Sequence, residues 1–210
     1  MSAVTVRPAG DRALLLEPAD AAQLPLLLDH LRRAPIDGVA DLLPAARTVL
    51  LTLCPGIDPA AIESRVRALD LASDADSDSA AAADVVTVPV RYDGPDLADA
   101  AELLGITPGQ LVERHADAQW RCAFIGFAPG FGYLHAPDAG LSVPRRSQAR
   151  TVVPAGSVAL AGGYSAVYPR SSPGGWQIIG RTDVVLWDVA RPEPALLRAG
   201  TRVRFEAVDR

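Results

Sequence analysis

The feature that most constrains this chain is a stretch of small and acidic residues near its middle. Residues 72–84 read ASDADSDSAAAAD, with no large apolar side chain and no apolar periodicity. Such a segment cannot bury enough apolar surface to offset the entropy lost on ordering, so we expect a flexible linker. The linker divides the chain into two domains, residues 1–71 and residues 85–210.

The first domain is expected to be a small α+β layer. Asp58-Pro59 places an N-cap residue before a proline at the first helical position. The order strand-strand-helix-strand-strand-helix suits a sheet with helices on one side. Apolar patterns predict strands at 4–6, 14–16, 39–43 and 48–53, and helices at 24–33 and from 59 onwards.

The second domain opens with strict apolar alternation over residues 85–92, where Pro89 indicates an edge strand. A helix is expected at 96–104, and a capping box at 107–110 opens another that carries Leu111 and His115 on one face. Beyond them, short apolar runs alternate with Gly/Pro turns, which predicts a β-sandwich or a closed barrel. The expected strands are 122–127, 151–153, 157–161, 166–168, 177–180, 184–188 and 202–207.

Composition excludes several functional classes. All twenty basic residues are Arg, so a P-loop lysine, Schiff-base chemistry and a Ser-Lys dyad are excluded. The net charge of -5 argues against nucleic-acid binding. No apolar run approaches the ~18 residues of a membrane helix and no signal peptide is visible, so we expect a cytoplasmic protein. Cys54 and Cys122 fall in different domains and are expected to be free thiols.

Residues 124–182 contrast with this acidic background. The stretch is rich in glycine and aromatic residues, and no Asp or Glu lies between Asp138 and Asp183. A locally cationic, glycine-rich region in an acidic protein indicates a site for an anionic ligand or an acidic partner. Five arginines lie within it: Arg145, Arg146, Arg150, Arg170 and Arg181.

Two short motifs in this stretch could bind an anion. Successive N–H groups of Gly174 and Gly175 could form an anion nest walled by Trp176, although a tight turn would explain the same residues. The adjacent Arg145 and Arg146 are either part of a site or a solvated pair.

The three histidines give weaker signals. His30 is expected to be a half-exposed surface residue, and His135 a loop residue without a partner. His115 lies near the end of its predicted helix, where a structural role and a site role are equally compatible with the pattern. No His, Cys, Asp or Glu cluster has metal-ligand spacing, so no metal is expected.

Several segments of this region closely resemble one known family. They are GFAPGFGYL at 126–134, VPRR at 143–146, RTVVPAGSVALAGG at 150–163 and YPRSSPGGWQIIGRT at 168–182. The family is that of KipI and allophanate hydrolase subunit 1, which includes the PxpB component of the bacterial ATP-dependent 5-oxoprolinase. GDRALL at 10–15 and LLRAGTRVRF at 196–205 are similar too, so the resemblance covers essentially the whole chain.

The resemblance implies an α+β fold in which a small α+β N-terminal domain precedes a cyclophilin-like β-barrel domain. It implies a homologous partner (KipA or PxpC, allophanate hydrolase subunit 2) and a further partner, PxpA. Together these would open the lactam of 5-oxo-L-proline to L-glutamate with ATP, which the partner proteins would help to bind. The alternatives are a KipI-like inhibitor of a sensor histidine kinase and half of a biotin-dependent urea or amide carboxyltransferase. Biotin is expected only in the last case.

The resemblance also implies that the chain furnishes one wall of a site completed by its partner. Arginines and backbone N–H groups can stabilise phosphate or an oxyanion, and a histidine can assist them. The expected catalytic residues are therefore Arg145, Arg146 and His115. The residues expected to bind the small amide substrate or an anion are Gly130, Tyr133, Arg150, Pro154, Gly156, Ser157, Tyr168, Ser172, Gly174, Gly175, Trp176 and Arg181.

Two positions depart from the family pattern. Gly132 stands where the family usually has proline, and 164–166 reads Tyr-Ser-Ala where many members have Gln-Thr-Gly. If the second loop touches the substrate, another amide or a urea-like molecule would replace 5-oxoproline.

Overall fold

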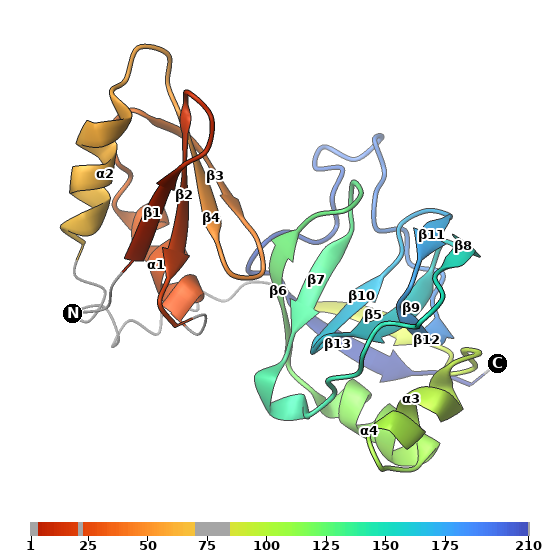
Figure 1. Cartoon of the computed structure of the whole chain (residues 1–210). Coiled ribbons are helices and arrows are strands. Elements are labelled where there is room, and N and C mark those ends of the chain that lie inside the picture. The colour runs from red at the N-terminus through yellow and green to blue at the C-terminus, as the bar shows by residue number, and fades with distance from the viewer. Residues whose placement is uncertain (1–3, 21–22, 70–84, 210) are drawn as a thin grey trace. The chain divides into compact units, whose positions relative to one another are not determined.

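The computed structural model describes residues 4–20, 23–69 and 85–209 (Figure 1). The chain divides into two compact units, Met1–Ala81 and Ala82–Arg210, each described here by itself. The segment 72–84, predicted to be a linker, lies outside the described residues. Among the described residues, no helix is long and apolar enough to span a membrane.

The first unit is a four-stranded antiparallel sheet in the order β1-β2-β4-β3, packed against two helices. Leu16 and Leu51 of the sheet share one core with Leu27 of α1 and Ile62 of α2, so both helices cover the same face. The predicted cap is present, since the Asp58 carboxylate accepts a hydrogen bond from the Ala60 amide at 3.0 Å. The elements are β1 (Val4–Pro8), β2 (Ala13–Pro18), α1 (Leu24–Arg33), β3 (Val39–Pro44), β4 (Val49–Leu53) and α2 (Pro59–Arg67).

The second unit is built on a seven-stranded sheet in the order β12-β9-β10-β7-β6-β13-β5, with a separate β11-β8 pair. The capping box opens α4 as predicted, with Thr107 and Gln110 bonded reciprocally. The helices and strands are β5 (Val85–Val90), α3 (Leu97–Leu103), α4 (Pro108–Asp117), β6 (Trp120–Ile125), β7 (Gly132–His135), β8 (Arg150–Val153), β9 (Ser157–Ala161), β10 (Tyr164–Val167), β11 (Ser172–Gly174), β12 (Gln177–Arg181) and β13 (Arg202–Ala207).

The seven-stranded sheet curls into a nearly closed barrel. β5 and β12 are the two ends of the strand order, yet Arg91 and Arg181 exchange two backbone hydrogen bonds of 2.9 Å. Pro89 lies in β5, in agreement with the edge position predicted for it. The α+β class and the barrel-like second domain are therefore confirmed.

The barrel sheet has apolar clusters on both faces. Leu160 of β9 joins the interior cluster with Leu111 and Trp120, whereas its neighbour Ala159 joins an outer cluster with Phe131 and Trp176. This alternation is the normal consequence of strand geometry, in which successive side chains point to opposite faces. The outer cluster includes three of the predicted site residues, Tyr133, Tyr168 and Trp176.

Three strand predictions were wrong. Residues 184–188 form no strand, because no described strand pairs with them and Trp187 makes only an isolated bridge to Ala195. The strands β7 and β11 were missed, because their glycines indicated turns. In β7 the glycine serves close packing instead, since a Cβ on Gly132 would lie 3.1 Å from the Cys122 sulfur. His135, predicted to be in a loop, lies in β7.

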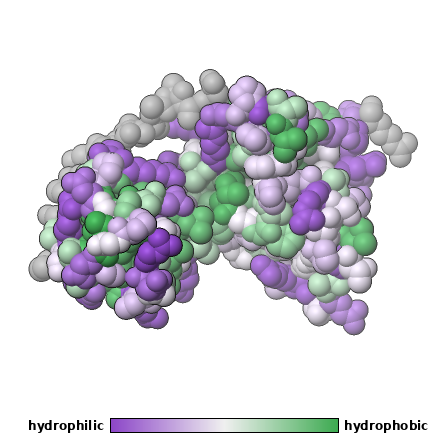
Figure 2. Space-filling view, turned by 90° about the horizontal axis from the view of Figure 1, so that it is seen from above, coloured by the Kyte–Doolittle hydropathy of each residue, from purple (hydrophilic) through white to green (hydrophobic). Residues whose placement is uncertain are grey.

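Apolar side chains also reach the surface of the second unit. Figure 2 shows hydrophobic residues among hydrophilic ones on the face that it views. The large exposed ones include Phe127, at 60% exposure, and the alternate residues Val185, Trp187 and Val189. Of these, Phe127 adjoins the site described below.

Candidate functional site

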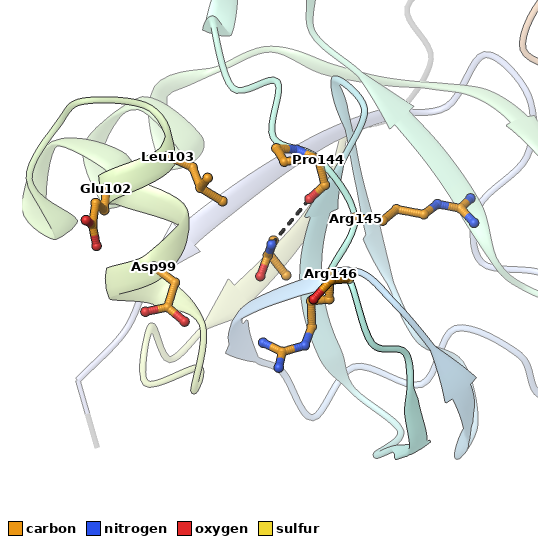
Figure 3. A pocket seen from close by; sticks show the side chains of 8 residues that line it. Asp99, Glu102, Leu103, Pro144, Arg145 and Arg146 are labelled. Carbon is orange, nitrogen blue, oxygen red and sulfur yellow. Dashed lines mark hydrogen bonds between the residues drawn. The ribbon is translucent and has the colours of Figure 1, made fainter.

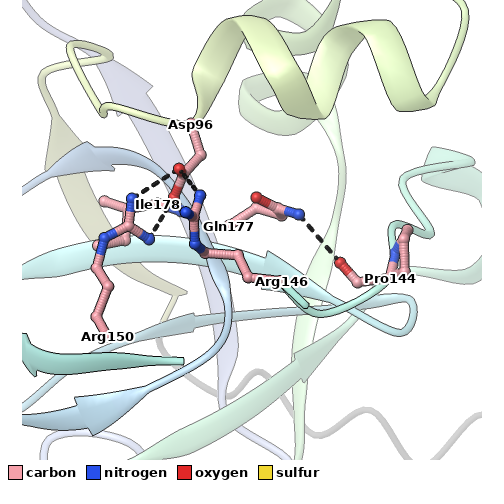
Figure 4. A network of polar contacts seen from close by, with 6 residues as sticks. All are labelled: Asp96, Pro144, Arg146, Arg150, Gln177 and Ile178. Atoms are coloured by element: carbon pink, nitrogen blue, oxygen red, sulfur yellow. Dashed lines mark hydrogen bonds and ion pairs between the residues drawn. The ribbon is translucent and has the colours of Figure 1, made fainter. Parts of the chain in front are cut away.

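The centre of the polar structure is a buried carboxylate that the sequence did not single out. Asp96 precedes α3 as its N-cap residue, yet its side chain makes no capping bond and is 1% exposed. It accepts hydrogen bonds from Arg146 (2.5 Å), from both terminal nitrogens of Arg150 (2.8 and 2.7 Å) and from the Ile178 amide (2.7 Å). Figure 4 shows the two guanidinium groups converging on this carboxylate.

The expected cluster of free cations is therefore wrong for three of its members. Arg146 and Arg150 are paired with Asp96, and Arg181 lies 2.6 Å from Asp93. The acidic partners come from the loop before α3, about fifty or more residues earlier in the chain. The stretch is free of acids in sequence, but the fold supplies them from elsewhere.

Arg145 differs from its neighbour. It is exposed and forms no ion pair with any described residue. Residues 144–146 have no regular structure, and Figure 3 shows the Arg145 side chain pointing away from α3 while that of Arg146 points toward it. A cavity of about 680 Å³ lies between α3 and this segment, and both arginines are among the residues that line it, although the Arg145 side chain points away from α3.

The positive charge of Arg145 acts on the phenol groups of two tyrosines. Burial raises the pKa of Tyr133, and the nearby positive charge of Arg145 partly opposes that rise. The pKa of Tyr168 is likewise raised by burial and lowered in part by Arg145. Both hydroxyls therefore stay protonated near neutral pH. Tyr168 is 2% exposed, so Tyr133, which is only partly buried, is the one of the two that a ligand can reach.

Aromatic rings form a wall behind these groups. The ring centroid of Trp176 lies 5.6 Å from that of Tyr133 and 5.7 Å from that of Phe131, in edge-to-face contacts. Phe127 lies 6.3 Å from Tyr168 and stays mostly exposed. Its φ of 65° is strained for a residue with a side chain, and such strain concentrates at functional sites.

The predicted anion nest at 174–175 is wrong. Neither glycine has a positive φ, and Gly174 lies in β11. The Gly175 carbonyl accepts a hydrogen bond of 2.7 Å from the Arg146 amide. A Cβ on Gly174 would collide with the Tyr168 hydroxyl, so glycine is needed there to admit the tyrosine.

His115 lies in the interior and not at the site. It is completely buried, with Nδ1 2.7 Å from the Tyr92 hydroxyl and Nε2 2.8 Å from the Ser165 hydroxyl. Burial lowers its pKa to about 3. Both ring nitrogens already have partners, so the geometry gives His115 a structural role and corrects the expectation that it is catalytic.

The remaining predicted residues lie in turns or are buried. The turn at 154–157 is held by a 2.8 Å bond from the Ser157 hydroxyl to the Pro154 carbonyl. Gly156 has a φ of 78°, and a Cβ there would meet the Thr182 carbonyl. Gly130 packs against the backbone of Leu186. Ser172 is 6% exposed.

Four predicted residues thus come together: Arg145, Tyr133, Tyr168 and Trp176. Asp96 was not predicted, because an acidic residue before a helix indicates a cap. The exposed Phe127 was not predicted either, although its place in GFAPGFGYL was an available signal. Among the described residues, no group of three His, Cys, Asp or Glu could hold a metal. The exposed Arg145 guanidinium, the partly buried Tyr133 hydroxyl and the exposed Phe127 ring can contact a small molecule with a single anionic group, while Tyr168 and Trp176 pack beneath them.

A family comparison agrees with this architecture. The model of the carboxyltransferase domain, subdomain C and D, matches residues 4–197, and the chain belongs to that family. A crystal structure of TTHA0988 is 32% identical, with a TM-score of 0.75 over 98% of this chain and 41% of that one. The urea carboxylase of Kluyveromyces lactis, at 20% identity and a TM-score of 0.71, shares the fold over 98% of this chain and 22% of its own.

Curated relatives are more similar to this chain in sequence than these two solved structures are. The 5-oxoprolinase B subunit of Escherichia coli O157:H7 is 47% identical over 123 residues, or 57% of this chain and 56% of that protein. The protein of the same name from Bacillus subtilis (strain 168) is 40% identical over 128 residues, 60% of this chain and 53% of its own length. The resemblance predicted from the motifs is confirmed, and the alignment spans about half the length of these relatives.

Proposed function

We propose that this chain acts as the PxpB component of a cytoplasmic ATP-dependent 5-oxoprolinase, which opens 5-oxo-L-proline to L-glutamate. The names of the curated relatives support the proposal. The observation that carries it is Arg145, which is exposed, has no ion pair among the described residues and is near enough to Tyr133 and Tyr168 for its charge to lower their pKa values.

The chemistry of the substrate suits this site. 5-Oxoproline is a five-membered lactam ring with one carboxylate, so it presents one anionic end and an apolar edge. Arg145 binds the carboxylate, since a planar guanidinium matches its two oxygens, and Tyr133 donates a further hydrogen bond. Phe127 contacts the ring methylenes, with Trp176 behind the tyrosine.

The residues present do not fit ATP. A triphosphate requires several cations or converging backbone N–H groups. Here Arg146, Arg150 and Arg181 are already paired with carboxylates, and the 174–175 glycines form no nest. The nucleotide therefore belongs to the partners PxpA and PxpC, and this chain supplies the surface that holds the lactam.

The partners also have to supply the reacting groups. The Arg145 site contains no carboxylate base and no activated nucleophile among the described residues, and His115 is enclosed in the core. Opening a lactam requires stabilisation of a developing oxyanion. The homologous PxpC, facing the Arg145 surface, would complete the site.

Reconstitution with PxpA and PxpC tests the proposal. The 5-oxoproline-dependent hydrolysis of ATP is expected to require this chain. Loss of one charged hydrogen bond is worth about 1.5–3 kcal/mol, so Arg145→Ala should raise KM for 5-oxoproline about 10- to 150-fold with little change in kcat. The control Arg204→Ala, on the exposed side of β13, should match the wild type. Turnover that does not depend on this chain, or an unchanged KM in Arg145→Ala, contradicts the proposal.

A second candidate is one half of a biotin-dependent carboxyltransferase, because the matching family model is that of a carboxyltransferase domain. Arg145 could bind the carboxylate of carboxybiotin as well as it could bind any other single anionic group. The site therefore gives no specific reason to place biotin in it. Carboxylation of urea or another amide in the presence of a biotin carboxylase, without turnover of 5-oxoproline, would favour this candidate.

A further inference from the structure

One buried carboxylate joins three segments that are far apart in the sequence. Asp96, in the loop before α3, binds Arg146 and Arg150 of the 144–150 segment and the amide of Ile178 in β12 (Figure 4). Each Asp96 oxygen accepts from two donors: Oδ1 from Arg146 and Arg150, Oδ2 from Arg150 and Ile178. No described carboxylate other than Asp96 is bonded to two arginines at such low exposure.

Residues 144–149, the part of the 144–150 segment that precedes β8, depend on these contacts for their conformation. They form no helix or strand, so their backbone is not fixed by regular hydrogen bonding. The Pro144 carbonyl accepts from the Gln177 side chain at 3.3 Å, and the Arg146 amide donates to the Gly175 carbonyl at 2.7 Å. Together with the Asp96 ion pair, these bonds tie the residues on both sides of Arg145.

Arg145 itself makes none of these bonds. Its side chain points away from that of Arg146 (Figure 3), so the anchoring of Arg146 on one side determines where Arg145 points on the other. The guanidinium that binds the substrate is therefore held indirectly, through its neighbour.

We propose that Asp96 is a positioning residue, which by anchoring Arg146 holds Arg145 on the opposite side of the 144–150 segment, where it faces the substrate. The inference rests on the proposed function for its effect on substrate binding. Its geometric part concerns this chain alone.

The variant Asp96→Asn removes the negative charge of the side chain but keeps its size. Both oxygens of Asp96 accept two donors, so an asparagine of the same size must turn its NH2 group toward donors on one side. Two of the four bonds are then lost and the two guanidinium groups repel each other without a counter-charge. We expect the 144–150 segment to shift.

In the reconstituted complex, Asp96→Asn should raise KM for 5-oxoproline about tenfold or more, because small misplacements of a binding group are costly. The double variant with Arg145→Ala should be no worse than Arg145→Ala alone, since both act through one guanidinium. The matched control is Asp93→Asn, in the same loop and also paired with an arginine, which should leave KM unchanged. Additive effects of Asp96→Asn and Arg145→Ala would overturn the proposal.

A second measurement needs only this chain. The Tyr133 ring carbon bonded to oxygen can be followed by NMR through a pH titration. Arg145 lowers the pKa of Tyr133, so this pKa should rise when the charge is removed in Arg145→Ala and also when it is moved away in Asp96→Asn. A raised Tyr133 pKa with an unchanged KM would support the positioning role of Asp96 but refute the proposed function. An unchanged Tyr133 pKa would refute the positioning role. If Asp96→Asn does not fold, Arg146→Gln makes the same test, because it keeps the Asp96–Arg150 pair.

Discussion

The buried His115 makes the stability of the second unit depend on pH. Its ring contacts Phe205 at 4.3 Å and Trp120 at 5.1 Å between centroids, and its nitrogens are bonded to Tyr92 and Ser165. A neutral imidazole donates from one nitrogen and accepts at the other, which satisfies both hydroxyl contacts. No charged group among the described residues is bonded to the ring, so nothing compensates a positive charge there, and burial lowers its pKa to about 3.

The sign of the effect follows from proton binding. In the unfolded chain the pKa of histidine is about 6.5. Between pH 6.5 and about 3 the unfolded state binds a proton that the native state does not. The stabilisation from a neutral His115 is therefore complete above pH 6.5 and is lost as pH falls through this window, at about 1.4 kcal/mol per pH unit. From pH 7 to pH 4.5 the free energy of unfolding should fall by roughly 2–3 kcal/mol because of this residue.

Urea unfolding at a series of pH values measures this loss. The three tryptophans, Trp120, Trp176 and Trp187, all lie in the second unit, so their fluorescence follows that unit alone. His115→Gln, which does not titrate, should be less stable at pH 7 but should lose about 2–3 kcal/mol less than the wild type on going to pH 4.5. His135→Gln, at an exposed position of β7, should keep the wild-type slope. An equal slope in His115→Gln and the wild type would refute the reasoning.

Two further predictions concern thiols and glycines. In the native protein at pH 8 a thiol reagent should modify Cys54 but not Cys122, because Cys122 is 1% exposed and burial raises its pKa to about 12. Both thiols should react in urea. Fast modification of two thiols before unfolding would contradict this prediction. Gly174→Ala should destabilise the second unit by about 1–3 kcal/mol, since the new methyl group meets the Tyr168 hydroxyl. Gly175→Ala, where the nearest atom is 3.7 Å away, should change the unfolding midpoint little, and equal effects of the two would be inconsistent with this packing.

Features set by neighbouring residues were predictable from the sequence. The Asp58-Pro59 start of α2 and the capping box of α4 depend on residues within one helical turn, and both are present. The alternation over 85–92 predicted the strand β5, in which the buried residues Val88 and Val90 lie two positions apart. The motifs around Tyr133 and Trp176 brought together residues that the outer face of the barrel does collect.

Features that depend on distant parts of the chain were not predictable in this way. Val185 and Trp187 alternate with Leu186 as in a strand, but no described strand pairs with them, and Trp187 forms a single bridge to Ala195. Asp96 has the pattern of an ordinary cap, and only the fold shows that its partners lie fifty or more residues later. Ion pairs between remote residues leave no periodicity to detect.

The arginine-rich stretch shows why counting charges along a sequence overestimates the capacity for anions. Five cations without a nearby acid suggested a site for a highly charged ligand such as a phosphorylated group. The barrel brings Asp93 and Asp96 across to this stretch, where Asp96 pairs with both Arg146 and Arg150 and Asp93 pairs with Arg181. Arg145 and Arg170 have no ion pair with a described residue, and of these two it is Arg145 whose charge acts on Tyr133 and Tyr168; one guanidinium matches one carboxylate and not a triphosphate. The same pairing that removes charge from the site holds the segment carrying Arg145, so neutralisation and positioning are two effects of one buried aspartate.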